Sequence, residues 1–251
     1  ETTRNCNLAC VHCRASASMG PHEGELGTDE ALRLLDQIAE VAKPIIILTG
    51  GEPLLRSDIF DIARYGTELG LRMVMALNGT LVTEKVARQL VESGIQRISV
   101  SLDGSSAETH DRFRQVKGAF ESTLRGIQLI KNAGLAFQIN TTITKTNLDQ
   151  IPKIQELAID LGAVAHHIFL LVPTGRAKDK LCAVFLSVAG CQRGARAASR
   201  RERGGQALFQ PEHLRTRVER EAQSRDHSWN LVMRVDGVLH AFFFNWVVLD
   251  E

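Results

Sequence analysis

Three cysteines near the start of the sequence are the residues best suited to carry chemistry. Cys6, Cys10 and Cys13 form a Cys-x3-Cys-x2-Cys run, and cysteines this close together converge more readily on a metal than on a disulfide framework. A fully protein-ligated [4Fe–4S] cluster takes four cysteines, so a triad leaves one iron free for an exogenous ligand. The run predicts such a cluster. A zinc site that adds His12 is the alternative, although structural zinc sites usually space their paired ligands farther apart than His12 and Cys13.

A second group of candidate residues follows the apolar run 45–48. This group is Thr49-Gly50-Gly51-Glu52-Pro53. Paired glycines let the backbone approach a ligand closely, and the carboxylate of Glu52 or nearby carbonyls can accept hydrogen bonds from an ammonium group. Alone, such a Gly-Gly pair is an ordinary turn. Following the cysteine run, it favours a ligand site.

The elements that must position these residues alternate regularly. Short apolar runs predict strands, and the segments between them place apolar residues at helical spacing. Thr28, Ser57, Thr83 and Asn147 are candidate helix caps, and Gly94 and Gly162 are among the glycines placed where helices should stop. The predicted strands are 45–48, 73–77, 98–102, 137–140 and 164–171, and the predicted helices are 31–41, 59–69, 85–92, 119–133 and 151–161.

This alternation implies parallel strands joined by right-handed crossovers, in either an α/β barrel or a doubly wound sheet. In both architectures ligands meet the loops at the carboxyl ends of the strands, where the candidate residues fall. The pattern ends near Arg176. All eight lysines lie at or before Lys180, whereas ten of the twenty-two arginines follow it. We therefore expect a core domain over 1–176, whose start need not be the native one, and an unassigned region over 177–251 that is an arginine-rich extension or frame-shifted sequence.

Composition narrows the classes of partner. Thirty lysines and arginines balance 29 aspartates and glutamates, so no overall field attracts nucleic acid, and a small molecule is the expected partner. The longest late apolar stretch, 238–249, is interrupted by His240 and Asn245 and falls short of the roughly 20 residues of a membrane span. With no secretory leader, the expected location is cytoplasmic.

Taken together, the cysteine run and the Gly-Gly-Glu-Pro turn make residues 1 to about 176 resemble the radical S-adenosylmethionine (SAM) superfamily. The resemblance implies an α/β fold, a partial (β/α)6 TIM-like barrel, with an unassigned C-terminal segment. It implies that a [4Fe–4S] cluster is held by Cys6, Cys10 and Cys13, and that SAM is contacted by Gly50, Gly51 and Glu52, with His12 near the adenine.

The same resemblance suggests that Ser101 and Arg114 hold the SAM carboxylate, for which a guanidinium fork is well matched. A capped turn and a surface ion pair are the plainer readings of these two residues. Asn78 and Asn140 end predicted strands, where they can line the SAM pocket or serve as ordinary strand ends.

Three residues near the end of the predicted barrel have no assigned role. Of the adjacent His166 and His167, at most one should face the barrel lumen, because neighbouring residues on a strand point to opposite faces. Arg176 either pairs with a substrate carboxylate or is solvated. No residue is assigned as catalytic.

Within the superfamily the core resembles the haem b synthases of the sirohaem-dependent haem pathway. The resemblance implies that a 5′-deoxyadenosyl radical removes hydrogen from propionates of iron-coproporphyrin III. Loss of carbon dioxide and a further electron then converts two propionates to the vinyl groups of haem b, with a ferredoxin or flavodoxin as electron donor. Only Cys182 and Cys191 follow the core, so a complete auxiliary cluster, and full turnover with it, is not expected of this chain alone.

Two other readings remain open. The first is another tetrapyrrole-modifying or peptide-modifying radical SAM enzyme, because the core motifs report SAM chemistry and not the substrate. The second is a non-catalytic zinc-binding or degenerate interaction module.

Overall fold

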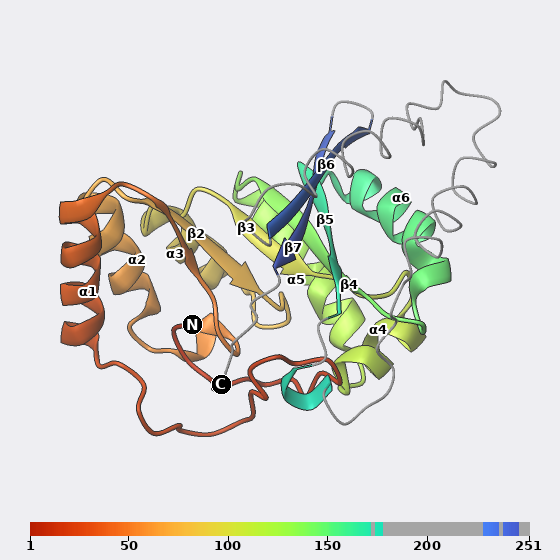
Figure 1. The fold of residues 1–251 in the computed structure, drawn as a ribbon, viewed down its shortest axis with the longest axis horizontal. Coiled ribbons are helices and arrows are strands. Elements are labelled where there is room, and N and C mark those ends of the chain that lie inside the picture. The colour runs from red at the N-terminus through yellow and green to blue at the C-terminus, as the bar shows by residue number, and fades with distance from the viewer. Residues whose placement is uncertain (172–173, 178–227, 236–237, 246–251) are drawn as a thin grey trace.

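The computed structural model describes residues 1–171, 174–177, 228–235 and 238–245 (Figure 1). Its centre is a parallel sheet in which five strands follow one another in chain order. Such an order requires every crossover to return on the same side, which curls the sheet into a half-barrel and confirms the predicted fold class. The strands are β1 (Ile45–Leu48), β2 (Arg72–Leu77), β3 (Ile98–Ser101), β4 (Phe137–Ile143) and β5 (Ala165–Leu170).

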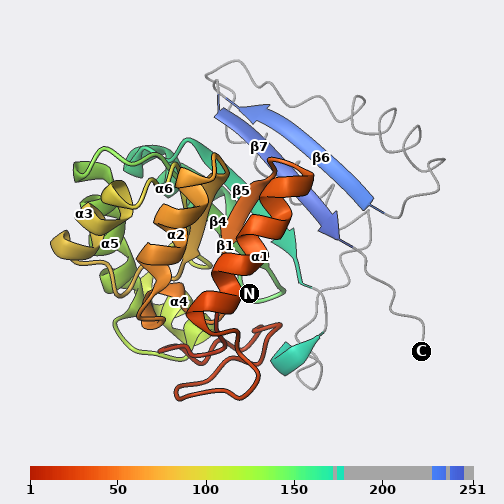
Figure 2. The same ribbon diagram turned by 90° about the vertical axis from the view of Figure 1, so that its left-hand side faces the viewer.

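Helices cover one side of this sheet (Figure 2). Their apolar stripes meet the face of the strands that carries Met73, Met75 and Ile139, all of which are completely buried. Burial of this shared apolar surface is the main stabilising contribution to the half-barrel. The helices are α1 (Thr28–Val41), α2 (Ile59–Glu68), α3 (Glu84–Glu92), α4 (Ala107–Arg114), α5 (Ala119–Asn132) and α6 (Ile151–Leu161), with short 3-10 turns η1 (Pro53–Leu55), η2 (Leu148–Gln150) and η3 (Gly175–Ala177).

The helix ends agree with the sequence signals in part. Thr83 caps α3 by accepting a hydrogen bond from Val86 N at 3.2 Å, as predicted. The caps predicted at Thr28 and Ser57 are wrong. Helix α1 starts one residue earlier than a cap at Thr28 requires, so Thr28 is already helical, and α2 starts one residue later than a cap at Ser57 requires, so Asp58 is its N-cap. Asn147 is at the N-cap position of η2, and Gln150 is at the N-cap position of α6.

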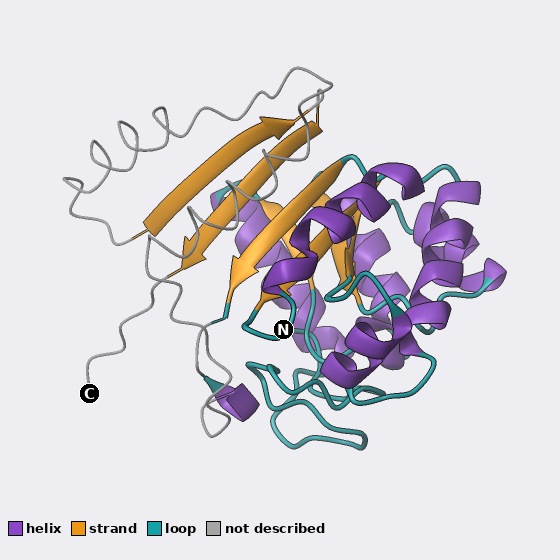
Figure 3. Cartoon of the chain, turned by 90° about the vertical axis from the view of Figure 1, so that its right-hand side faces the viewer, coloured by secondary structure: helices purple, strands orange, loops and turns teal. Residues whose placement is uncertain are grey.

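Two further strands lie beyond the core. β6 (Ser228–Val235) and β7 (Val238–Asn245) form an antiparallel pair, and β7 runs beside β5. Figures 2 and 3 place this pair on the side of the sheet away from the helices. The predictions for 177–251, including the reading as frame-shifted sequence, fall mostly outside the described residues and remain predictions. Cys182 and Cys191 lie outside the described residues as well.

Candidate functional site

The segment before the first cysteine lies against the Gly-Gly-Glu turn at the carboxyl end of β1. Thr2 N donates to Thr49 O at 2.6 Å, and Gly51 N donates to Thr3 O at 2.6 Å. A Cβ atom on Gly51 would stand 2.3 Å from Asn5 O, closer than any side chain tolerates. The paired glycines therefore admit the chain's own backbone, whereas the sequence suggested only the close approach of a ligand.

That contact positions the cysteine loop, by which we mean residues 6–17. The loop contains the three predicted cluster ligands, has no regular secondary structure, and is hydrogen-bonded to Phe113 and Arg114, which follow β3. Cys6 and Cys10 are buried, Cys13 is half-buried, and all three thiols are free.

Every sulfur in the loop has a hydrogen-bond donor. Leu8 N donates to Cys6 Sγ at 3.4 Å, and Ala17 N donates to Cys13 Sγ at 3.3 Å. Arg114 Nη1 lies 3.5 Å from Cys10 Sγ. Cysteine binds iron as a thiolate, and donors and a cation beside the sulfurs suit the negative charge of that form.

Burial favours the protonated form of the Cys6 thiol. Burial raises the pKa of Cys6 to about 11, and the backbone hydrogen bond from Leu8 opposes this shift only in part. Iron binding must therefore displace a proton from Cys6.

Arg114 reaches Cys10 because α4 ends beside the cysteine loop. The sequence predicted a loop here; the structure forms a helix that buries Arg114 and pairs it with Asp103, which follows β3. Asp103 is completely buried, and its second oxygen accepts a hydrogen bond from Thr142 N at 2.7 Å. The reading of Arg114 as a surface ion pair is wrong, because the pair lies in the interior.

Asp103 also connects to His12, the residue predicted to lie near adenine. His12 Nε2 is 3.9 Å from Asp103 Oδ2, and its ring packs on Phe113 with centroids 4.5 Å apart. Burial lowers the pKa of His12 to about 4, although Asp103 opposes the shift. Burial would raise the pKa of Asp103, but Arg114 and then His12 hold it below its ordinary value. The titratable groups at this edge are thus an ionised Asp103–Arg114 pair beside the neutral imidazole of His12.

Glu52 connects the loops after β1 and β2. It is completely buried and accepts hydrogen bonds from Asn78 N at 2.8 Å and Leu54 N at 3.3 Å. Burial raises its pKa to about 7, against the effect of these two amides. Asn78 in turn donates to Asn7 Oδ1 at 2.8 Å, and Asn7 donates to Thr80 Oγ1 at 2.9 Å. Glu52 and Asn78 therefore lie in one network with the cysteine loop.

Ser101 and Asn140 lie side by side on neighbouring strands. The register pairs Ser101 with Asn140, and Asn140 with His167 on β5. Gln138 Nε2 joins this row, at 3.2 Å from Asn140 Oδ1 and 3.3 Å from His167 Nδ1. This polar row lies on the face of the sheet opposite the helix-covered apolar core.

The two adjacent histidines point to opposite faces, as predicted. His166 is buried and its Nε2 lies 2.8 Å from Thr141 Oγ1, within the helix-covered side. Arg176 does not extend into solvent; its guanidinium folds back onto the cysteine loop.

The sequence reading assigned no role to Asp103 or His110. Asp103 N donates to His110 Nδ1 at 3.2 Å, and burial lowers the pKa of His110 to about 4. The available signal for the Asp103–Arg114 pair was an aspartate directly after a predicted strand, followed by an arginine in the predicted loop.

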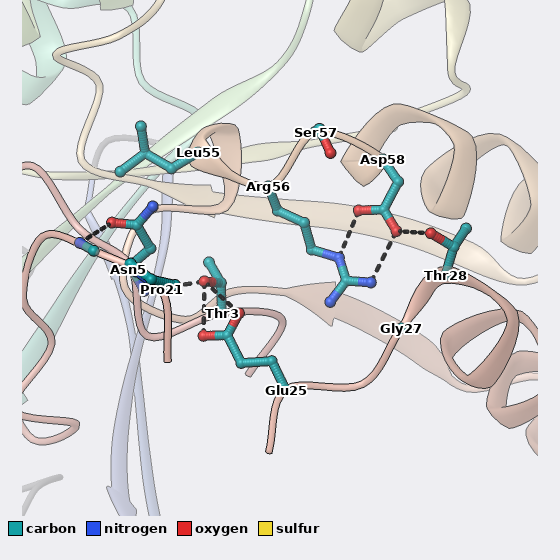
Figure 4. Close-up of a pocket in the computed structure, with 11 residues that line it drawn as sticks. Thr3, Asn5, Pro21, Glu25, Gly27, Thr28, Leu55, Arg56, Ser57 and Asp58 are labelled. Atoms are coloured by element: carbon teal, nitrogen blue, oxygen red, sulfur yellow. Dashed lines mark hydrogen bonds and ion pairs between the residues drawn. The ribbon is translucent and has the colours of Figure 1, made fainter. Parts of the chain in front are cut away.

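A surface pocket of about 290 Å³ lies between the N-terminal segment, residues 20–28 and residues 55–58 (Figure 4). Its charged side chains already have partners: Arg56 donates to both oxygens of Asp58, and Glu25 accepts from Thr3 Oγ1 at 2.9 Å. The pocket is lined by none of the cysteines. It ties loops together and is not the candidate site.

The residues present fit an iron–sulfur cluster. Each thiolate of such a cluster binds a different iron, so the sulfurs stand farther apart than the ligands of one ion. Over the described ranges, no three His, Cys, Asp or Glu side chains converge as ligands of a single metal ion would. The donors aimed at the three sulfurs suit an anionic cluster.

The chain is similar to known proteins of one kind. A family model described as the radical SAM superfamily matches residues 1–158. The AdoMet-dependent heme synthase of Methanosarcina barkeri is 56% identical over 179 residues, which cover 71% of this chain and 51% of that protein. The Fe-coproporphyrin III synthase of the same organism is 43% identical over 155 residues, covering 62% of this chain and 39% of that protein.

A solved structure of Streptococcus suis SuiB bound to S-adenosylmethionine has a TM-score of 0.66 at 16% identity, covering 80% of this chain and 47% of that one. This likeness shows the fold. The chain spans about half the length of the first of the curated relatives it matches. In the part of the chain that the structure describes, no helix has the length and apolarity needed to cross a membrane.

Proposed function

Because the chain belongs to the radical SAM superfamily, whose enzymes use a [4Fe–4S] cluster and SAM, we propose that it forms the core of an iron-coproporphyrin III decarboxylase that produces haem b. The observation that carries the chemistry is the cysteine loop, in which three free thiols each have a donor. The substrate class is supported by the 56% identical relative named AdoMet-dependent heme synthase.

In this proposal Cys6, Cys10 and Cys13 hold the cluster. When bound and reduced, the cluster supplies the electron that splits SAM into methionine and a 5′-deoxyadenosyl radical. The chain's own residues bind and orient: Leu8 N, Ala17 N and the Arg114 guanidinium hold the sulfurs. Holding SAM and substrate in a fixed orientation lets the hydrogen transfer proceed as a unimolecular step.

SAM would be held along the carboxyl edge of the sheet. We assign its contacts to Gly50, Gly51, Glu52, His12, Ser101, Arg114, Asn78 and Asn140. Glu52 and Asn78 already belong to the network that reaches the cysteine loop through Asn7. Arg114 would share its guanidinium between Asp103 and the SAM carboxylate, for which its five donors suffice.

The remaining parts of the proposal concern partners. The relative named Fe-coproporphyrin III synthase, at 43% identity, also acts in tetrapyrrole chemistry by its name, which supports a tetrapyrrole substrate. We further propose a ferredoxin or flavodoxin as electron donor, a cytoplasmic location and no nucleic-acid partner. Residues 1–176 would form the core, and 177–251 stay unassigned.

The test is anaerobic reconstitution of the full chain with iron and sulfide, followed by reduction and chromatography for 5′-deoxyadenosine. We expect a brown protein that cleaves SAM, and a Cys10→Ala variant that is colourless and inactive. Iron-coproporphyrin III should bind with a spectral change and increase 5′-deoxyadenosine formation.

Three results would contradict the proposal in different ways. Zinc without iron in air-free protein would support the interaction module. Iron without SAM cleavage would remove the radical chemistry. SAM cleavage unaffected by the porphyrin, with no specific porphyrin binding, would favour a peptide or another substrate.

A further inference from the structure

Arg176 makes three hydrogen bonds to the backbone of the cysteine loop. Its Nε donates to Cys10 O at 2.9 Å, and its Nη1 donates to Ala17 O at 2.5 Å. Its own backbone N donates to Cys13 O at 3.0 Å. One residue of η3 therefore binds carbonyls from the middle to the C-terminal end of a loop more than 150 positions earlier in the chain.

The same loop turns its amides toward the sulfurs. Leu8 N donates to Cys6 Sγ, and Ala17 N donates to Cys13 Sγ. Without helix or strand to fix its peptide planes, the loop can keep these N–H groups on sulfur only if other contacts hold its backbone. In the first half of the loop, Ala9 N and Val11 N donate to the carbonyls of Arg114 and Phe113. In the second half, the bonds from Arg176 to the carbonyls of Cys10, Cys13 and Ala17 contribute the restraint.

We infer that Arg176 is a positioning residue for the iron–sulfur cluster: its guanidinium and backbone amide fix the cysteine loop in the conformation that aims amides at the cysteine sulfurs. The inference rests on the cluster-binding part of the proposed function and is independent of the substrate. It differs from the sequence-based reading of Arg176 as a partner for a substrate carboxylate, because the two guanidinium nitrogens with hydrogen bonds donate to the cysteine loop.

The geometry calls for arginine and for the glycine before it. A guanidinium presents Nε and Nη1 in a rigid planar fork, which two separate carbonyls can accept together; a lysine ammonium is a point donor on a flexible stem. Gly175 has φ +56, and a Cβ there would stand 2.2 Å from Arg14 O and 2.4 Å from Cys13 O. Gly175→Ala should therefore lift η3 off the loop without changing Arg176.

The experiment compares wild type, Arg176→Gln, Arg176→Lys and Gly175→Ala, each reconstituted as the full chain. The matched control is Arg14→Gln, because Arg14 lies in the same loop but its side chain is 76% exposed and forms an ion pair with Glu1 rather than with the loop backbone. Loss of cluster absorbance to an added iron(II) chelator measures how firmly the loop holds the cluster. The midpoint potential of the cluster reports on the hydrogen bonds to the cysteine sulfurs, because those bonds tune the potential.

We expect Arg176→Gln to lose the cluster about tenfold faster than wild type, the factor corresponding to one lost charge-assisted hydrogen bond. Its potential should become more negative, because loosened amides stabilise the reduced cluster less. Arg176→Lys and Gly175→Ala should behave like Arg176→Gln, and Arg14→Gln like wild type.

Two outcomes would overturn the inference. One is an Arg176→Gln protein with wild-type cluster lifetime and potential. The other is full rescue by Arg176→Lys, which would show that charge suffices and the fork does not matter. Circular dichroism of the cluster-free proteins checks folding, and if Arg176→Gln does not fold, Gly175→Ala and Arg176→Lys decide by the same criteria. Failure of wild type to bind a cluster would refute the proposed function itself, whereas wild-type binding with unchanged variants refutes only the role of Arg176.

Discussion

Replacing Asp103 by asparagine should destabilise the fold by an amount set by the buried charge of Arg114. Asp103 is 0% exposed and Arg114 is 7% exposed, so neither charge is solvated once its partner is removed. Removing one member of a buried ion pair costs about 3–5 kcal/mol. Asparagine keeps an oxygen for Thr142 N, now 2.7 Å from the carboxylate, so the substitution reports mainly on the lost charge.

The pairwise part can be isolated with a second substitution. Arg114→Met leaves the Asp103 carboxylate buried without its cation, and the pKa of that carboxyl should then rise. In the double variant Asp103→Asn, Arg114→Met neither charge remains. We expect its loss of stability to be smaller than the sum of the two single losses, with a coupling of roughly 2–3 kcal/mol.

The assay is urea-induced unfolding of the cluster-free protein at neutral pH, followed by circular dichroism. An exposed pair provides the control: Arg64 Nη1 lies 2.8 Å from Asp61 Oδ1, and the two side chains are 49% and 67% exposed. Removing that pair should change the free energy of unfolding by less than about 1 kcal/mol. A change of that small size for Asp103→Asn, or strict additivity in the double variant, would refute the claim that the Asp103–Arg114 pair is desolvated.

Three other predictions follow, two on buried titratable groups and one on a close backbone contact. Burial lowers the pKa of His110 from 6.5 to about 4, so the neutral ring contributes stability above pH 6.5 that is lost as the pH falls to 4. His110→Asn should flatten this decline in the free energy of unfolding, measured from pH 6.5 to 4, by on the order of 3 kcal/mol at most. Burial raises the pKa of Glu52 from 4.5 to about 7, so its effect has the opposite sign, and stability is lost as the pH rises from 4.5 to 7. Glu52→Gln should abolish that loss, whereas an unchanged pH profile of the free energy of unfolding would mean that Glu52 is not desolvated. Gly51→Ala would force its Cβ against Asn5 O, and we expect a loss of about 1–3 kcal/mol together with poor cluster retention, both measured against wild type.

The sequence predicted well those features that depend on local patterns. Apolar periodicity located all five core strands, with ends within a few residues; β4, for example, continues to Ile143 where 137–140 was predicted. The cysteine spacing and the Gly-Gly-Glu turn identified the edge of the sheet that carries the candidate site. These signals are local because a strand, a turn or a run of ligands is encoded within a few consecutive residues.

The sequence did not predict contacts that join distant parts of the chain. Arg114 and Cys10 are separated by 104 positions, and Arg176 and Cys10 by 166. No periodicity encodes such pairs, and without the three-dimensional arrangement Arg176 reads as a solvated residue or a substrate contact. The same limit applies to α4, whose polar sequence has a weak apolar stripe. Its buried residues include Thr109, His110 and Phe113, and the His110 ring packs against Phe120 of α5, so tertiary contacts support this helix.

The site can be understood as an irregular loop held from several directions by buried polar groups. Glu52 connects it to β1 and β2 through Asn78, and Asp103 connects it to β3 and β4 through Arg114 and Thr142. Each connection places a desolvated carboxylate at a strand end, which is unfavourable unless its partners stay in place. The fold therefore couples the integrity of the strand ends to the position of the thiols: loosening any one partner both destabilises the sheet edge and releases the cysteine loop.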